Sequence, residues 1–232
     1  MKIYKPLNIA VFTKKEDGKF RVQKLRAGHC HAASRNALPA KPEKAFELAL
    51  LSINKTNHNN MLSESMKNDY NAEVYAVAME AMALSPDGAL FKNIFSDAVK
   101  TAKAANYALD AIYKYRCKFL ENEINRTVSS TEKLRLVNEG VSVASEWLSS
   151  VRGITEIRRK EAPVTVLYSF YVSKLHFESA LAKELEIGAR KADISNLLQL
   201  ENAAHEAERF DLAFNSRQLA NYYLKAVPPD VI

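Results

Sequence analysis

Apolar residues recur every three or four positions along most of the chain, which is the spacing of one face of an α-helix. The pattern begins near residue 42, is interrupted by a polar stretch at residues 54–60, and then continues almost to the C-terminus. It predicts helices over residues 42–53, 66–84, 91–124, 130–151, 163–185, 194–209 and 212–227. We therefore expect a mainly α protein, either a long-helix bundle or an irregular helical array of six to seven helices.

Residues that suit helix ends support some of these boundaries. Ser129 and Glu132 are spaced as a capping box, in which each side chain bonds the backbone amide of the other residue. This pair predicts a helix start at residue 130. Asp193 and Asp211 are of the residue type that caps helices, so we expect them to precede the last two helices.

The segment around Pro163 carries mixed signals. Arg158-Arg159-Lys160 precedes the proline and is predicted to be the cationic end of a helix. Pro163 itself suits the first position of the helix that follows. Residues 164–172 are rich in β-branched and aromatic side chains, so they fit either a helix or a strand.

The N-terminal segment has a different pattern, with apolar residues at every second position. Residues 7–12 and 20–23 alternate in this way, and Asp17-Gly18 lies between them as a turn signal. These features predict a small N-terminal β-hairpin. Pro39 and Pro42 then mark a soft boundary, so we expect residues 1–38 to form a hairpin with a short helix and residues 39–232 to form a helical domain.

Glycine and cysteine content excludes several classes of protein. The chain has 6 Gly and 7 Pro in 232 residues, and no two glycines are closer than ten positions. Phosphate-binding and dinucleotide-binding loops need clustered glycines, so both are excluded. With 2 Cys there is no disulfide framework, and no apolar run reaches the roughly 20 residues of a membrane span. We expect a cytoplasmic protein without a membrane partner.

Positive charge is concentrated at the N-terminus. The formal net charge is +6, but residues 1–60 contain twelve Lys or Arg against four Asp or Glu, so they carry +8 and the remaining residues carry −2. A basic two-stranded ribbon can bind a phosphate backbone. Lysines on a strand can equally serve to prevent edge-to-edge aggregation. The candidate nucleic-acid-binding residues are Lys14, Lys15, Lys19, Arg21, Lys24 and Arg26.

Two groups of residues could bind a metal. His29-Cys30-His31 places three soft ligands together, but a closed zinc site needs a fourth, and the sequence offers no paired motif to supply it. Glu201, His205 and Glu208 are spaced to share one face of a helix, which also fits a solvated polar surface. We therefore predict no metal, no other cofactor and no catalytic residue.

These observations favour a non-enzymatic protein that works through protein-protein interaction, as an assembly or adaptor protein. Its partner is expected to be another protein or a second copy of itself. The alternative is a nucleic-acid-binding accessory protein that uses the basic hairpin. The third hypothesis is a metal-dependent helical enzyme centred on Glu201, His205 and Glu208.

Overall fold

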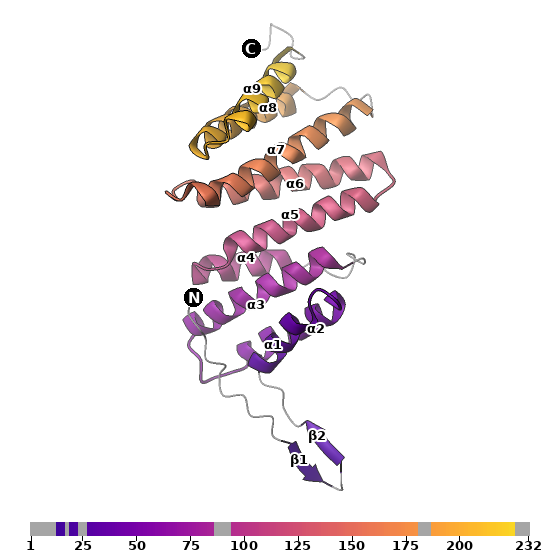
Figure 1. The fold of residues 1–232 in the computed structure, drawn as a ribbon, viewed down its shortest axis with the longest axis vertical. Helices are drawn as coiled ribbons and strands as arrows, with labels where there is room; N and C mark the ends of the chain where they lie inside the picture. The colour runs from indigo at the N-terminus through magenta and orange to yellow at the C-terminus, as the bar shows by residue number, and fades with distance from the viewer. Residues whose placement is uncertain (1–12, 17–18, 23–26, 86–93, 181–186, 226–232) are drawn as a thin grey trace. The chain divides into compact units, whose positions relative to one another are not determined.

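The computed structural model describes residues 13–16, 19–22, 27–85, 94–180 and 187–225 (Figure 1). Within these residues the chain forms two short strands and nine α-helices. In chain order they are β1 (Thr13–Glu16), β2 (Lys19–Val22), α1 (Ala27–Ala37), α2 (Pro42–Asn57), α3 (Glu64–Leu84), α4 (Ile94–Ala105), α5 (Leu109–Arg126), α6 (Ser130–Val151), α7 (Ile157–Ala180), α8 (Ile187–Glu206) and α9 (Phe210–Lys225). The mainly helical class is confirmed, and residues 164–172 are helical.

The predicted hairpin is not matched. Its first strand, residues 7–12, lies outside the described residues. The two strands that are described pair antiparallel, with Thr13 opposite Val22 and Glu16 opposite Lys19. Residues 14–16, which lie between the two predicted strands, are therefore part of the ladder. The alternation of apolar residues favoured the earlier segment, whereas the observed pairing leaves two residues, Asp17 and Gly18, between the strands.

The expected count of six to seven helices is too low, chiefly because the helix predicted over residues 91–124 is α4 followed by α5. Between them Asn106 and Ala108 have positive φ angles of 49° and 63°. The Tyr107 amide donates to the Ala102 carbonyl at 3.1 Å, which is the bond of a Schellman helix end. A turn of this kind usually contains glycine, which is absent here, so the pattern of apolar residues did not predict it.

The end of α8 has the same geometry. Glu208 has a φ of 56°, and the Arg209 amide donates to the Ala204 carbonyl at 2.9 Å. Helix α8 therefore ends at Glu206, before the predicted end at residue 209, and α9 begins at Phe210. Asp211 consequently lies in the first turn of α9, where it accepts hydrogen bonds from Arg209.

Contacts between helices divide the chain into two units, Met1–Phe119 and Leu120–Ile232. In unit 1 each helix packs mainly on its neighbours in sequence, α1 on α2, α2 on α3 and α3 on α4 (Figure 1). The boundary predicted between residues 38 and 39 falls between α1 and α2, which pack together. In unit 2, α6 packs on α7, α7 on α8 and α8 on α9.

Alanine and methionine side chains supply much of the core of unit 1, beside larger ones such as Phe46 and Tyr70. Helix α3 is rich in alanine and methionine, and it is buried on more than one face because α2 and α4 both cover it.

Ser52 of α2 donates to the Ala27 carbonyl of α1 at 2.7 Å. Because that bond uses the hydroxyl proton of Ser52, the Tyr70 hydroxyl of α3 donates to Ser52 Oγ, at 3.1 Å. A buried hydrogen-bond chain thus joins the first three helices.

Helix α6 begins as predicted, with Ser129 as its N-cap accepting from the Glu132 amide. Gly140 and Trp147 are among the residues that this helix buries. Gly140 allows α7 to approach closely. A Cβ atom at this position would lie 2.6 Å from Cζ of Phe170, which is much closer than carbon atoms pack.

Helix α7 begins at Ile157, so Pro163 lies inside it and not at its start. Arg158-Arg159-Lys160 therefore forms the first turn of a helix, whereas it was predicted to form the last. Cations are unfavourable near the positive end of a helix dipole. One compensation is that Lys160 Nζ bonds Glu206 of α8 at 2.8 Å.

A buried polar cluster joins α7, α8 and α9. Asp193 was predicted to cap a helix, but α8 starts at Ile187, so Asp193 lies within it and is buried. Its carboxylate accepts from Lys174 Nζ of α7 at 2.5 Å. Glu178 lies 3.9 Å from the same nitrogen and accepts from the hydroxyl of Tyr223 in α9 at 3.2 Å. Two buried carboxylates therefore share one buried ammonium group.

Among the described residues, none of the helices combines the length and apolar character that crossing a bilayer requires.

The close approach at Gly140 predicts that Gly140→Ala destabilises the protein. Overpacking costs about 1–3 kcal/mol, while alanine gains about 1 kcal/mol over glycine in helix propensity. We expect a net loss of up to about 2 kcal/mol in the free energy of unfolding, measured by urea denaturation. Gly153→Ala is the control, because no atom lies within 4 Å of its Cβ position. Replacing the ring by a smaller side chain, in Phe170→Leu, should lessen the loss of stability caused by Gly140→Ala. Equal changes in the free energy of unfolding for Gly140→Ala and Gly153→Ala would contradict the close packing of α6 on α7.

The buried cluster predicts that Lys174→Met is strongly destabilising. It leaves the carboxylate of Asp193 buried without the Lys174 ammonium group, and breaking such a pair costs about 3–5 kcal/mol. Lys44→Met is the matched control, because Lys44 and its partner Glu47 are both largely exposed. Exposed pairs contribute about 1 kcal/mol or less. Similar losses for the two variants in urea denaturation would show that the cluster contributes little.

Candidate functional site

Unit 1 contains a groove of about 670 Å³. This volume lies within the range of roughly 300–1,000 Å³ that is usual for ligand sites. The groove is formed by α1, the middle of α3, the α4–α5 turn and the start of α5, and we call it the α3–α5 groove. Its lining residues are Arg35, Leu38, Pro39, Glu73, Ala76, Val77, Glu80, Tyr107, Ala108, Asp110, Ala111 and Tyr115.

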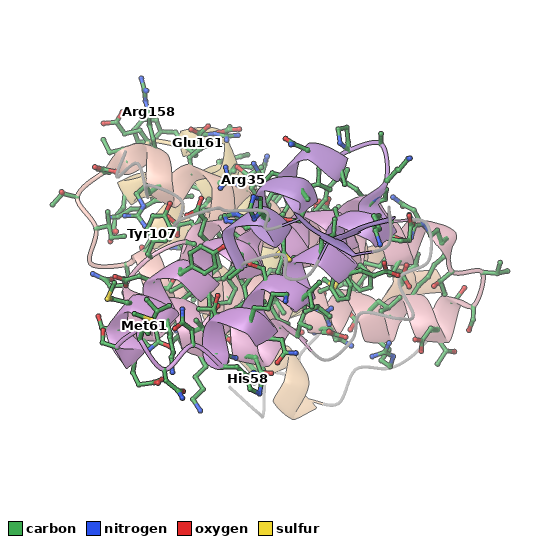
Figure 2. The ribbon with its side chains drawn as sticks, turned by 90° about the horizontal axis from the view of Figure 1, so that it is seen from below. Arg35, His58, Met61, Tyr107, Arg158 and Glu161 are labelled. Carbon is green, nitrogen blue, oxygen red and sulfur yellow. The ribbon has the colours of Figure 1, made fainter. Side chains whose placement is uncertain are left out.

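The local sequence explains the shape of the α3–α5 groove. On α3, Glu73, Ala76, Val77 and Glu80 follow the spacing of one helical face, so small apolar residues are flanked by carboxylates. The α4–α5 turn, held by its positive-φ residues, places Tyr107 beside this face. The Tyr107 side chain is 53% exposed, which leaves its ring accessible to a ligand. Figure 2 labels Tyr107 together with Arg35 of α1.

Carboxylates outnumber cations in the α3–α5 groove. Glu73, Glu80 and Asp110 line it, against the single guanidinium of Arg35. Arg35 forms an ion pair with Glu73, and its Nε donates to Nε2 of His31 at 3.1 Å. Burial lowers the pKa of His31, which favours the neutral ring that can accept this bond. The groove is therefore acidic overall.

Tyr115 contributes a hydroxyl to the same wall. Its pKa is raised to about 12, first by burial and then by the nearby Glu80 carboxylate, with which the hydroxyl forms a hydrogen bond. The phenol therefore stays protonated at neutral pH and can act as a donor. This bond holds a side chain of α5 against α3.

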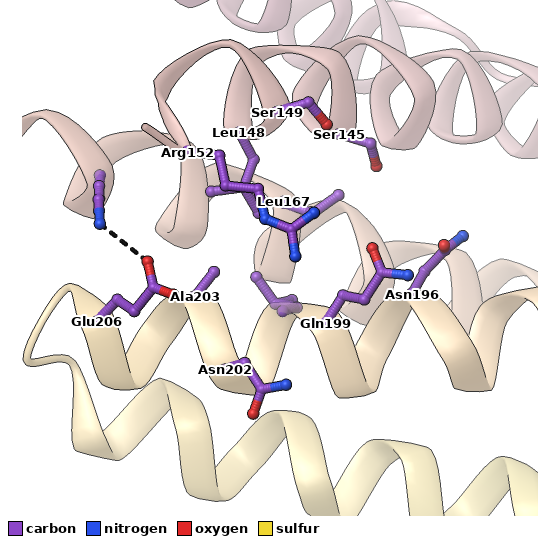
Figure 3. A pocket seen from close by; sticks show the side chains of 12 residues that line it. Ser145, Leu148, Ser149, Arg152, Leu167, Asn196, Gln199, Asn202, Ala203 and Glu206 are labelled. Carbon is purple, nitrogen blue, oxygen red and sulfur yellow. Dashed lines mark hydrogen bonds and ion pairs between the residues drawn. The ribbon is translucent and has the colours of Figure 1, made fainter. Parts of the chain in front are cut away.

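Unit 2 contains a smaller hollow between α6, α7 and α8 (Figure 3). Its volume is about 110 Å³, enough for a few water molecules or for one side-chain head group. Leu148, Leu167 and Leu200 supply apolar surface, and the latter two are buried. The polar lining residues of this α6–α8 hollow are Ser145, Ser149, Arg152, Lys160, Asn196, Gln199, Asn202 and Glu206.

The charges of the α6–α8 hollow are not balanced. Lys160 is neutralised by Glu206 at 2.8 Å. Arg152, which follows the last residue of α6, has no such partner among the described residues: its backbone amide bonds the Ser149 carbonyl, but its guanidinium makes no ion pair or hydrogen bond there. Figure 3 shows this guanidinium directed into the hollow, toward the side of Gln199.

The basic residues predicted from the hairpin are placed only in part. Lys14 and Lys15 lie in β1, Lys19 and Arg21 lie in β2, and Lys14 pairs with Arg21 in the ladder. Lys24 and Arg26 lie outside the described residues. Nucleic-acid binding by this segment stays a prediction.

The residues weighed as metal ligands are not brought together. Cys30 is fully buried in α1, and burial raises the pKa of its thiol. Glu201 pairs with Arg217 at 2.8 Å, and the His205 ring lies against Phe210. Glu208 lies in the turn after α8, so the predicted shared face does not exist. The described part of the chain holds no group of three His, Cys, Asp or Glu side chains suited to a metal ion.

Neither concave site was identified from the sequence. The best available signal for the α3–α5 groove was the pair Glu73 and Glu80, which flanks small residues on an otherwise apolar helix. For the α6–α8 hollow the signal was weaker, since Arg152 stands alone between two predicted helices. Both sites depend on which helices lie next to one another. The spacing of apolar residues within a helix does not show which other helix it packs against.

Comparison with known proteins gives no further guidance: no family model, curated protein or solved structure matches this chain.

Buried tyrosines predict that the protein loses stability at high pH. Burial raises the pKa of Tyr70, Tyr115, Tyr171 and Tyr223, in the case of Tyr115 to about 12. The ordinary value in an unfolded chain is about 10. Because the folded state holds these protons more tightly, its stabilisation is complete below about pH 10 and is lost as the pH rises through the folded values.

We therefore expect the free energy of unfolding, measured by urea denaturation, to fall between about pH 10 and 12. Tyr115→Phe should reduce the steepness of this fall, and Tyr107→Phe, at a largely exposed position, is the control. A free energy of unfolding that does not change over this interval would contradict the expected proton linkage.

Proposed function

We propose that this chain is a non-enzymatic interaction protein that binds a basic segment of another protein in the α3–α5 groove. The observation that carries the proposal is the combination of a ligand-sized concave surface with an excess of carboxylates. Three carboxylates face one guanidinium, and that guanidinium is already paired with Glu73. A cationic ligand is the complement of such a surface.

The packing of unit 1 supports a groove that is present before a partner binds. Each helix contacts chiefly its neighbours in sequence, an arrangement that in helical-repeat proteins creates concave binding surfaces. The α4–α5 turn is fixed by backbone hydrogen bonds, and Tyr115 is bonded to Glu80 across the groove wall. A peptide would therefore meet a preformed surface, and little ordering of the protein would oppose binding.

The residue types also favour a peptide with lysine or arginine. The exposed ring of Tyr107 can stack on a guanidinium or lie beneath an ammonium group, which contributes about 0.5–1 kcal/mol at an exposed site. Ala76, Val77 and Ala111 leave room for the aliphatic part of such a side chain. A long cationic side chain can make both contacts at once, whereas an acidic side chain cannot make the cation–π contact and would meet repulsion from the groove carboxylates.

Selection from a library of random peptides displayed on phage, with the full-length chain as bait, tests this proposal. We expect the selected peptides to be enriched in lysine and arginine, and their affinity to fall as the salt concentration rises. Selection of acidic or purely apolar peptides would contradict the proposal.

The site is then tested with Glu80→Gln/Asp110→Asn, which removes two groove charges. Each exposed ion pair contributes about 0.2–1 kcal/mol, so we expect the loss of two to lower affinity for a selected peptide about two- to thirtyfold in fluorescence anisotropy. Glu47→Gln/Glu64→Gln is the matched control, because it removes two exposed charges from the same unit outside the groove. Equal affinities for the two double variants would exclude the α3–α5 groove as the binding site.

A further inference from the structure

Unit 2 carries a second feature, which is independent of the proposed peptide groove. We infer that the α6–α8 hollow binds the carboxylate of a glutamate side chain, with Arg152 as the residue that holds it. The inference rests on three observations. The Arg152 guanidinium points into the hollow and has N–H donors without a partner among the described residues. The other two are the net charge of the hollow and its combination of polar and apolar lining residues.

The guanidinium of Arg152 is available for a ligand. It points into the hollow and has no ion pair or hydrogen bond among the described residues (Figure 3). An arginine presents two parallel N–H groups that match the two oxygens of a carboxylate, and such paired bonds are about twice as strong as neutral ones. The side-chain amide of Gln199, which also lines the hollow, supplies a further donor group.

The net charge of the hollow selects among anions. Arg152 and Lys160 contribute two positive charges, and Glu206 contributes one negative charge, so the lining carries a net charge of +1. This matches a carboxylate, which carries one charge. A phosphate carries about −1.5 to −2 near neutral pH and would have to lie near the Glu206 carboxylate. The charges therefore favour a carboxylate over a phosphate.

The size and apolar part of the hollow suit a glutamate side chain. A volume of about 110 Å³ admits a head group with a short stem, but it is well below that of usual metabolite sites. Leu148 lines the hollow and is only half-buried, so it offers apolar surface against which two methylene groups can pack. A glutamate combines this short apolar stem with a terminal carboxylate. Acetate would lack the stem, and phosphate would lack any apolar part.

Nuclear magnetic resonance of the full-length chain tests this inference with small probes. N-acetylglutamate amide should shift the side-chain N–H signals of Arg152 and Gln199 in a saturable way. N-acetylglutamine amide, which has the same shape without the charge, should shift them little. Acetate and inorganic phosphate are added to separate carboxylate recognition from general anion binding. If phosphate binds more tightly than the glutamate probe, or if no probe causes saturable shifts, the inference is wrong.

Variants connect the binding to particular residues. Arg152→Gln should weaken binding of the glutamate probe about tenfold or more, since bonds to charged groups are among the strongest here. Arg152→Lys keeps the charge without the paired N–H groups and should restore only part of the affinity. Arg158→Gln is the matched control: it removes the same charge from an exposed position that does not line the hollow (Figure 2). Equal effects of Arg152→Gln and Arg158→Gln would show that binding depends only on the overall charge of the protein, and would overturn the inference.

A gain-of-function variant tests the charge argument from the opposite direction. Glu206→Gln frees Lys160 and raises the net charge of the hollow to +2. We expect the glutamate probe to bind about two- to fivefold more tightly, and phosphate to gain more than the glutamate probe does. Unchanged affinity for both anions would show that the hollow does not select ligands by charge.

Discussion

Close contact between consecutive helices is the constraint on which both units depend. Helices that pack chiefly on their neighbours in sequence must bury their apolar faces there, and small residues at the contact let the backbones approach. Ala45, Ala49 and Ala72 serve this purpose in unit 1, where all are fully buried. Gly140 does so in unit 2, where the ring of Phe170 occupies the space of a side chain. Both concave sites lie where helices that are not consecutive, α3 and α5 or α6 and α8, contribute residues to one lining.

Buried hydrogen bonds and ion pairs connect particular helices within each unit. Ser52 and Tyr70 join the first three helices through hydroxyl groups. Lys174 and Asp193 join α7 to α8 through opposite charges, and the Tyr223 hydroxyl joins α9 to Glu178 of α7. A buried charge has few satisfactory positions, so the ionic cluster restricts how α7 and α8 can slide along each other. Apolar contacts alone tolerate such sliding more readily. The hydroxyl chain therefore helps to fix the register of α1, α2 and α3, and the ionic cluster that of α7 and α8.

The sequence predicted most of the helices because their apolar periodicity and some caps, such as Ser129, are local properties. The predicted helix boundaries were wrong where the backbone has positive φ angles without glycine, at Asn106, Ala108 and Glu208. Asp193 looked like a cap because buried carboxylates are rare, and its partner Lys174 is 19 residues away. The sites were harder still. The α3–α5 groove needs three helices in register, and the free guanidinium of Arg152 is visible only when its surroundings are known.

The glycine-free turn between α4 and α5 also determines how Tyr107 can behave as a recognition element. Most exposed aromatic side chains on helices can swing between rotamers over a smooth backbone. Here the residues on both sides of Tyr107 have left-handed backbone angles, and its amide is committed to Ala102. The base of the side chain is thereby anchored, although its ring remains in water. The point from which the ring projects is therefore set before a ligand binds, and rotation of the side chain is the adjustment left to the protein at this place in the α3–α5 groove.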